Sequence, residues 1–145
     1  MFKKVLVPID LNEPAFAEEA LKLALREVED NGAELHLLTV VPGFTNSFVA
    51  AYFSEKDHIN AVKKIAGKLQ DYSHTVMPEG VHPILRVYEG SPAETIVDYI
   101  TSKEINLVIM PAHHRSKIDE FFLGSVSARV AERAKCSVLL LKDNN

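Results

Sequence analysis

Short apolar runs take turns with longer amphipathic segments along the whole chain, and this alternation restricts the folds open to it. Five short apolar runs, mostly without alternation, predict strands covered on both faces; they lie at 5–7, 35–41 (broken by His36 and Thr39), 84–87, 107–110 and 138–141. Between them, apolar residues recur at helical spacing around 17–28, 59–76, 93–100 and 126–134. Strict alternation of strand and helix predicts right-handed crossovers. We therefore expect an open, doubly wound α/β fold, with a mainly parallel five-stranded sheet and four helices on its two faces.

Residues typical of helix ends support these assignments. Ser91-Pro92-Ala93-Glu94 combines an N-cap serine, a proline at the first helical position and a glutamate at the third. The first helix is expected to begin near Asn12 and Pro14 and to end at Asn31-Gly32, which tolerate a left-handed conformation. The last helix is expected to begin after Gly124, with Ser125 as its N-cap.

Size, charge and cysteine content exclude several classes of protein. A chain of 145 residues, 47% of them hydrophobic, predicts one globular domain over 1–145. A formal charge of −4 is the opposite of a nucleic-acid-binding footprint. No apolar run approaches the roughly 18 residues of a membrane span, and Pro8 and Asp10 interrupt the start before a secretory signal can form. With one cysteine, Cys136, we expect a cytoplasmic protein that binds neither membrane nor nucleic acid.

Open parallel sheets bind ligands beyond the carboxyl ends of their strands, where the strand order reverses. In this sequence those ends fall at Asp10, at Val41-Pro42, at Glu89-Gly90 and at the segment from Met110 to Arg115. The candidate site is therefore expected to draw its residues from these four places.

The segment after the fourth strand carries the most chemistry. His113, His114 and Arg115 are cationic or can become so, and the segment leads into the expected helix start at Ser125. The first amides of that helix, up to Val126 and Ser127, and its dipole favour a bound anion. These groups could hold a phosphate, but Gly-Ser before a helix, taken alone, more often indicates a simple helix cap.

Four motifs together resemble the universal stress protein family across essentially the whole chain. They are the first strand from Lys4 to Asp10, the second from Leu37 to Pro42, the helix start Gly90-Ser91-Pro92-Ala93-Glu94-Thr95-Ile96, and the ending from Leu123-Gly124-Ser125-Val126 to Cys136-Ser137-Val138-Leu139. The resemblance implies an adenine nucleotide alpha hydrolase-like fold with strand order 3-2-1-4-5. It also implies a homodimer paired through the last strand.

One branch of that family holds ATP with a Gly-x2-Gly-x9-Gly-Ser/Thr loop, and the spacing fits here. Pro111 and His114 stand at the first two glycine positions, whereas Gly124 and Ser125 keep the last pair. Histidine tolerates positive φ better than most residues, but proline has no amide to donate and a fixed φ.

The resemblance then divides the expected ligand contacts into two groups. Adenosine contacts fall on the ends of the first two strands, at Pro8, Ile9, Asp10 and Val41, with Asp10 on the ribose or on Mg²⁺ and Val41 meeting the adenine through its backbone. Phosphate contacts fall on Met110, Pro111, His113, His114, Arg115, Gly124, Ser125, Val126 and Ser127. We expect ATP, with or without Mg²⁺, or a related adenine nucleotide.

The resemblance implies a stress-response protein, which we expect to bind or sense a nucleotide and not to be an enzyme. The alternative is a nucleotide-free dimeric interaction protein of the same fold, working through an aromatic segment, 43–57, that holds Phe44, Phe48, Tyr52 and Phe53. Slow ATP hydrolysis or phosphotransfer is a third hypothesis, which lacks a positioned general base. The stress, the client and any protein partner are not indicated.

Other constellations are weaker. A metal held by His113-His114 with Asp10 or Asp119 is disfavoured, because adjacent side chains of an extended segment point to opposite sides. The Walker A, GxGxxG and Gly-x-Ser-x-Gly patterns are absent. We expect the other histidines at strand edges or on the surface; they are His36, His58, His74 and His82.

Overall fold

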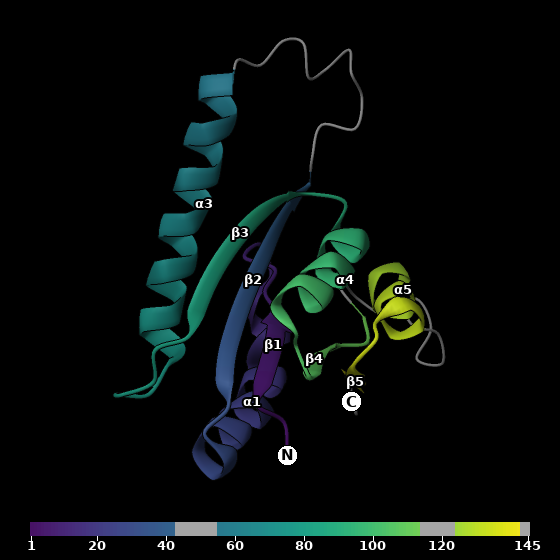
Figure 1. The fold of residues 1–145 in the computed structure, drawn as a ribbon. Coiled ribbons are helices and arrows are strands. Elements are labelled where there is room, and N and C mark those ends of the chain that lie inside the picture. The colour runs from purple at the N-terminus through teal and green to yellow at the C-terminus, as the bar shows by residue number, and fades with distance from the viewer. Residues whose placement is uncertain (43–54, 114–123, 143–145) are drawn as a thin grey trace.

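The computed structural model describes residues 1–42, 55–113 and 124–142. Its elements in chain order are β1 (Lys4–Pro8), the 3₁₀ turn η1 (Pro14–Ala17), α1 (Glu18–Asn31), β2 (Glu34–Pro42), α3 (Glu55–Val76), β3 (Ile84–Gly90), α4 (Pro92–Lys103), β4 (Leu107–Pro111), α5 (Ser125–Arg133) and β5 (Ser137–Leu141). The expected strands and helices are all present in the described residues (Figure 1). The α/β fold predicted from the alternation is confirmed.

The five strands form one parallel sheet in the order β3-β2-β1-β4-β5. This is the order that the family resemblance implied. The chain places β2 on one side of β1 and β4 on the other, so the strand order reverses between β1 and β4. The carboxyl ends of these two strands therefore mark the place where an open parallel sheet binds its ligand.

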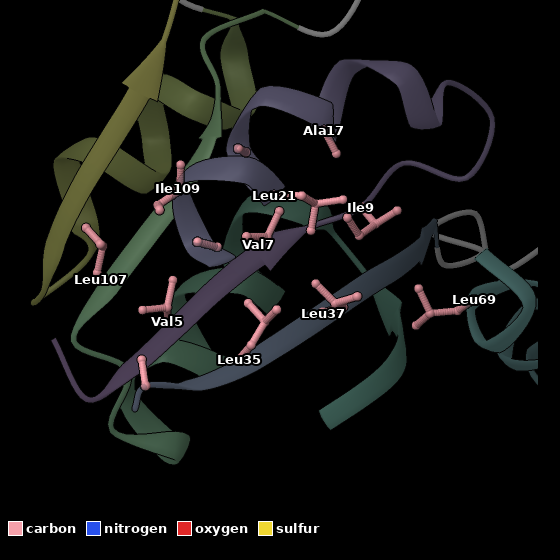
Figure 2. Close-up of a cluster of buried hydrophobic side chains, with 13 residues drawn as sticks. Val5, Val7, Ile9, Ala17, Leu21, Leu35, Leu37, Leu69, Leu107 and Ile109 are labelled. Carbon is pink, nitrogen blue, oxygen red and sulfur yellow. The ribbon is translucent and has the colours of Figure 1, made fainter. Parts of the chain in front are cut away.

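Each face of the sheet is covered by its own pair of helices. Apolar residues of β1, β2 and β4 pack on one face against α1 and α3, with Val5, Val7 and Leu37 at the centre (Figure 2). On the other face, Leu6 and Val108 pack against α4 and α5. Burial on both faces explains the apolar runs of the three central strands β1, β2 and β4, whereas the edge strands β3 and β5 have no buried residue.

The helix boundaries follow the capping residues with two differences. Ser91 is the N-cap of α4 and its hydroxyl donates to Glu94 Oε2 at 2.6 Å, while Gly32 ends α1 at φ 65°. The expected start near Asn12 and Pro14 is instead the η1 turn, and α1 begins only at Glu18. Ser125 was expected as an N-cap, but the N-cap of α5 is Gly124 and Ser125 is the first helical residue.

Helix α3 contributes little to the core along most of its length. Only Leu69 and Ser73 are buried, both in its second half. Figure 1 shows its first half rising beyond the carboxyl ends of the strands. The aromatic residues predicted to pack near this place, from Phe44 to Phe53, lie outside the described residues. Within the described part of the chain, no helix has the length and apolar character needed to span a membrane.

Candidate functional site

The end of β1 is held rigidly at the reversal point of the strand order. Ile9 is 3% exposed, and its amide donates to Leu38 O at 2.8 Å. Its own carbonyl accepts the Thr39 hydroxyl at 3.1 Å. These two bonds to β2 carry the chain in a defined direction from Pro8 through Ile9 to Asp10, the first polar side chain beyond the strand.

Asp10 is oriented by the turn that follows it. Its Oδ1 accepts the Asn12 amide at 2.9 Å, and its backbone carbonyl accepts the Glu13 amide at 3.1 Å. Such a turn is favoured because the aspartate side chain replaces a backbone acceptor. The carboxylate is thereby fixed at the carboxyl edge of the sheet, where the sequence placed it.

The end of β4 is joined to the start of α5. Met110 is buried, and Pro111 lies in register with Leu141 of β5. The next residue, Ala112, is fully buried; its amide donates to Leu141 O, and its carbonyl accepts the Gly124 amide, both at 2.8 Å. The two ends of the segment 114–123 are therefore fastened to each other.

Gly124 is favoured by close packing and not by its backbone angle, since its φ of −64° is ordinary. A Cβ at this position would lie 3.3 Å from Ala112 O, a backbone atom, and 3.6 Å from Ser127 Oγ. Two motif glycine positions, 111 and 124, lie in the described residues. At position 124 the close approach of Ala112 favours glycine, and at position 111 the extended strand backbone suits the fixed φ of proline.

The first turn of α5 presents amides at the same edge. The first intrahelical bond runs from the Ala128 amide to Gly124 O at 2.9 Å. The amides of Ser125, Val126 and Ser127 precede that bond and have no intrahelical acceptor. The Ser127 hydroxyl turns inward and donates to Ala112 O at 2.6 Å, so this residue reaches a ligand only through its amide. Ser125 is exposed.

Two buried polar atoms at this edge have no hydrogen-bond partner among the described residues. They are Nε2 of His113, just after β4, and Oε2 of Glu13, in the turn after β1. A buried polar atom without a partner is costly unless a water, a ligand or another side chain satisfies it. The sequence analysis identified His113 but missed Glu13, whose only local signal is its position beside Pro14 in the turn after the first strand.

Of the other residues that the sequence predicted to contact a ligand, the structure describes some, and the rest lie outside the described ranges. Val41 lies near the end of β2 in register with Glu89 of β3, and Glu89 lies 3.3 Å from Nδ1 of His58 in the first turns of α3. His114, Arg115 and Asp119 lie outside the described residues. Among the residues that are described, no three His, Cys, Asp or Glu side chains gather as a metal site.

His36 was expected at a strand edge or on the surface, and that expectation is wrong. It lies in β2 near the amino edge of the sheet and is 3% exposed. Its Nδ1 is 2.6 Å from the Tyr99 hydroxyl, and its Nε2 is 2.7 Å from Glu34 Oε2. A histidine inside an otherwise apolar strand run was the available signal. The expectation holds for His74 and His82, which are exposed, and for His58, which is partly exposed on α3.

Comparison with known proteins agrees with this architecture. The model of the universal stress protein family matches residues 1–142. The universal stress protein YxiE of Bacillus subtilis is 29% identical over 150 residues, covering 98% of this chain and 100% of that protein. The solved structure of protein MJ0577, a universal stress protein of Methanocaldococcus jannaschii, is 27% identical with a TM-score of 0.73, covering 100% of this chain and 99% of the other.

A further solved structure, a universal stress protein in complex with cAMP, has the same fold with a TM-score of 0.66 at 22% identity, covering 97% of each chain. The family model covers nearly the whole chain, and the sheet order agrees with it. The chain therefore belongs to the universal stress protein family.

Proposed function

We propose that this protein binds ATP, or a related adenine nucleotide, at the carboxyl edge of its sheet between β1 and β4. The observation that carries the proposal is the convergence of three features at the reversal of strand order. These are the oriented Asp10 carboxylate, the unpartnered Nε2 of His113 and the first amides of α5. Amides at a helix start together with a histidine suit a phosphate.

The order of the strands suggests how the nucleotide lies. Val41 is the last but one residue of β2, Asp10 follows β1 and His113 follows β4, and these strands are neighbours in that order. Neighbouring strands are about 4.8 Å apart, so the three positions span about 10 Å. An adenosine laid across them places its base against the Val41 backbone, its ribose or a bound Mg²⁺ at Asp10, and its phosphates at His113 and the Ser125 to Ser127 amides.

Two residues at motif glycine positions are expected to weaken nucleotide binding, and they support the nucleotide-free alternative. Pro111 offers no amide to a phosphate, and the His114 position carries a side chain where the motif has glycine. These two residues favour the second candidate, a nucleotide-free interaction protein of the same fold. The cAMP complex of another family member supports a nucleotide in that protein, and cAMP is the related ligand to test here beside ATP.

We propose further that the protein is a cytoplasmic homodimer that senses the nucleotide without turning it over. β5 is an edge strand, and Leu139 on it is 41% exposed. An exposed apolar edge strand needs a cover, and a two-fold mate of the same strand supplies one. Light scattering that finds a stable monomer would contradict the dimer.

Mass spectrometry of nucleotide released from the purified, acid-denatured protein tests the ligand directly. The expected result is stoichiometric ATP or another adenine nucleotide. Added Mg-ATP or cAMP should also raise the melting temperature, because saturation at about 100 times Kd stabilises the native state by roughly 2.7 kcal/mol. No released nucleotide and no shift at millimolar ligand would favour the nucleotide-free alternative.

A further inference from the structure

Glu13 is an acidic residue at the carboxyl edge to which the proposed nucleotide contacts give no role. Its amide donates to Asp10 O at 3.1 Å, so it belongs to the turn that Asp10 begins. The next residue, Pro14, starts η1, which packs against β4 and places the buried Ala17 in the core. Glu13 is therefore held close to the carboxyl ends of both β1 and β4.

One oxygen of the Glu13 side chain is buried and has no donor. Oε2 is shielded from water, and it has no hydrogen-bond partner among the described residues. Nε2 of His113, just beyond the end of β4, is buried and unpartnered in the same way. A carboxylate oxygen only accepts hydrogen bonds, so what completes this place is a donor or a cation.

Electrostatics favours a cation at this place when a nucleotide is bound. A triphosphate held at His113 and the first amides of α5 brings several negative charges close to the carboxylates of Asp10 and Glu13. Like charges at short range repel each other, and partial burial strengthens the repulsion. A cation between Glu13 and the phosphates replaces this repulsion by attraction.

We propose that Glu13 positions the Mg²⁺ of a bound Mg-ATP by accepting a hydrogen bond from one of the water molecules on the ion. The inference rests on the proposed nucleotide site, and it names the carboxylate that makes this site prefer the magnesium complex to free ATP. No covalent bond changes and no proton is transferred. Glu13 is a positioning residue, because it acts on the nucleotide through the hydrated ion.

The chemistry of the ion suits this arrangement. Mg²⁺ gives up its water reluctantly, and proteins usually bind it through one or two carboxylates together with the phosphates of the ligand. Within the described parts of the chain no three His, Cys, Asp or Glu side chains gather around a possible metal position, so these residues offer no cage of their own. We therefore expect Mg²⁺ to bind together with the nucleotide and not before it.

Calorimetric titration of ATP in EDTA and in excess MgCl₂, at matched ionic strength, tests the proposal on the full chain. Mg²⁺ should tighten the binding of ATP by at least about tenfold, within the usual range of coupling between two ligands. The affinity for cAMP should hardly change, because cAMP carries less negative charge. MgCl₂ alone should give no saturable heat at millimolar concentration.

Glu13→Gln keeps the shape of the side chain and removes its charge. In EDTA this variant should bind ATP as tightly as the parent or more tightly, and most of the tightening by Mg²⁺ should disappear. Because Oε2 has no donor to lose, the variant without nucleotide should be at least as stable as the parent. Glu18→Gln is the matched control: it removes an equal charge from an exposed position at the start of α1 and should keep the full effect of Mg²⁺.

Mn²⁺ in place of Mg²⁺ locates the ion independently of the affinity. Paramagnetic broadening by an ion depends steeply on its distance from the observed nucleus. Substoichiometric Mn-ATP added to the parent should therefore broaden the side-chain NMR resonances of Glu13 well before those of Glu18. This readout does not depend on how well any variant folds.

Four results would overturn the inference while the nucleotide site stands. They are equal ATP affinity with and without Mg²⁺, an unchanged effect of Mg²⁺ in Glu13→Gln, equal broadening at Glu13 and Glu18, and a cAMP affinity as dependent on Mg²⁺ as that of ATP. The first would mean that the chain neutralises the phosphates by itself, for instance with Arg115, which lies outside the described residues. No ATP binding in either buffer would overturn the proposed function and this inference with it.

Discussion

At the amino edge of the sheet the buried polar atoms of His36 and Tyr99 are paired with each other, whereas at the carboxyl edge Nε2 of His113 and Oε2 of Glu13 have no partner among the described residues. The paired edge stabilises the fold through its own contacts. At the carboxyl edge, the two unpaired atoms have lost their hydration without gaining a hydrogen bond in the protein, and a bound ligand can supply that hydrogen bond. Under the proposed function the carboxyl edge is the one that a ligand completes, so substitutions at the two edges should separate stability from nucleotide binding.

The largest effect on stability is expected from Tyr99→Phe at the amino edge. The substitution keeps the ring but leaves Nδ1 of the buried His36 without its hydrogen-bond partner, which should lower the free energy of unfolding by about 1–3 kcal/mol. Chemical denaturation measures the loss, and calorimetry should show the affinity for ATP unchanged. Tyr88→Phe at a more exposed ring is the control; an equal loss there would mean that the His36 bond contributes nothing special.

Gly124→Ala should act at the carboxyl edge with a smaller loss of stability. Its Cβ would meet Ala112 O at 3.3 Å, so the start of α5 must move by a few tenths of an ångström. We expect a loss of about 1 kcal/mol, at the lower end for overpacking, together with weaker ATP binding. Gly67→Ala is the matched control, since nothing lies within 4 Å of its added Cβ in α3 and it should stabilise the helix. A stabilised Gly124→Ala would refute the packing argument.

The smallest effect is expected from Glu94, which links α4 to α5 behind the carboxyl edge. The Ser91 hydrogen bond, with help from Arg129 and Arg133, holds the pKa of Glu94 below its ordinary value of 4.5. A lowered folded-state pKa stabilises the protein above the unfolded value, and this contribution is lost as pH falls through the folded value. Glu94→Gln should therefore slightly flatten the acid limb of the stability curve, that is, the fall in the free energy of unfolding below pH 4.5. Identical acid limbs in parent and variant would count against this contribution.

The elements and the edge that carries the site could be predicted from the sequence, because both depend on local patterns. Continuous apolar runs indicated the strands, and Ser91-Pro92 and Gly32 indicated helix ends. The burial of His36 could not be predicted, since its partner Tyr99 is 63 residues away in the sequence and comes from helix α4.

The details of the candidate site were only partly predictable for a similar reason. Ser125 and Gly124 are both acceptable N-caps, and the choice depends on the close approach of Gly124 to Ala112. The inward turn of the Ser127 hydroxyl also depends on Ala112, a residue that carries no chemical signal in the sequence. Contacts between segments on either side of a loop decide such details, and local patterns do not encode them.

Calorimetric titration of Mg-ATP into Ser125→Asp and Ser125→Ala tests the nucleotide site most directly. Ser125 is the first residue of α5, where a carboxylate favours the helix dipole, so the apo stability of Ser125→Asp should equal or exceed that of the parent. The same carboxylate repels a phosphate held by the neighbouring amides. The account predicts that Ser125→Asp loses ATP binding while Ser125→Ala retains most of it. Parental ATP affinity in Ser125→Asp would contradict a phosphate site at the start of α5.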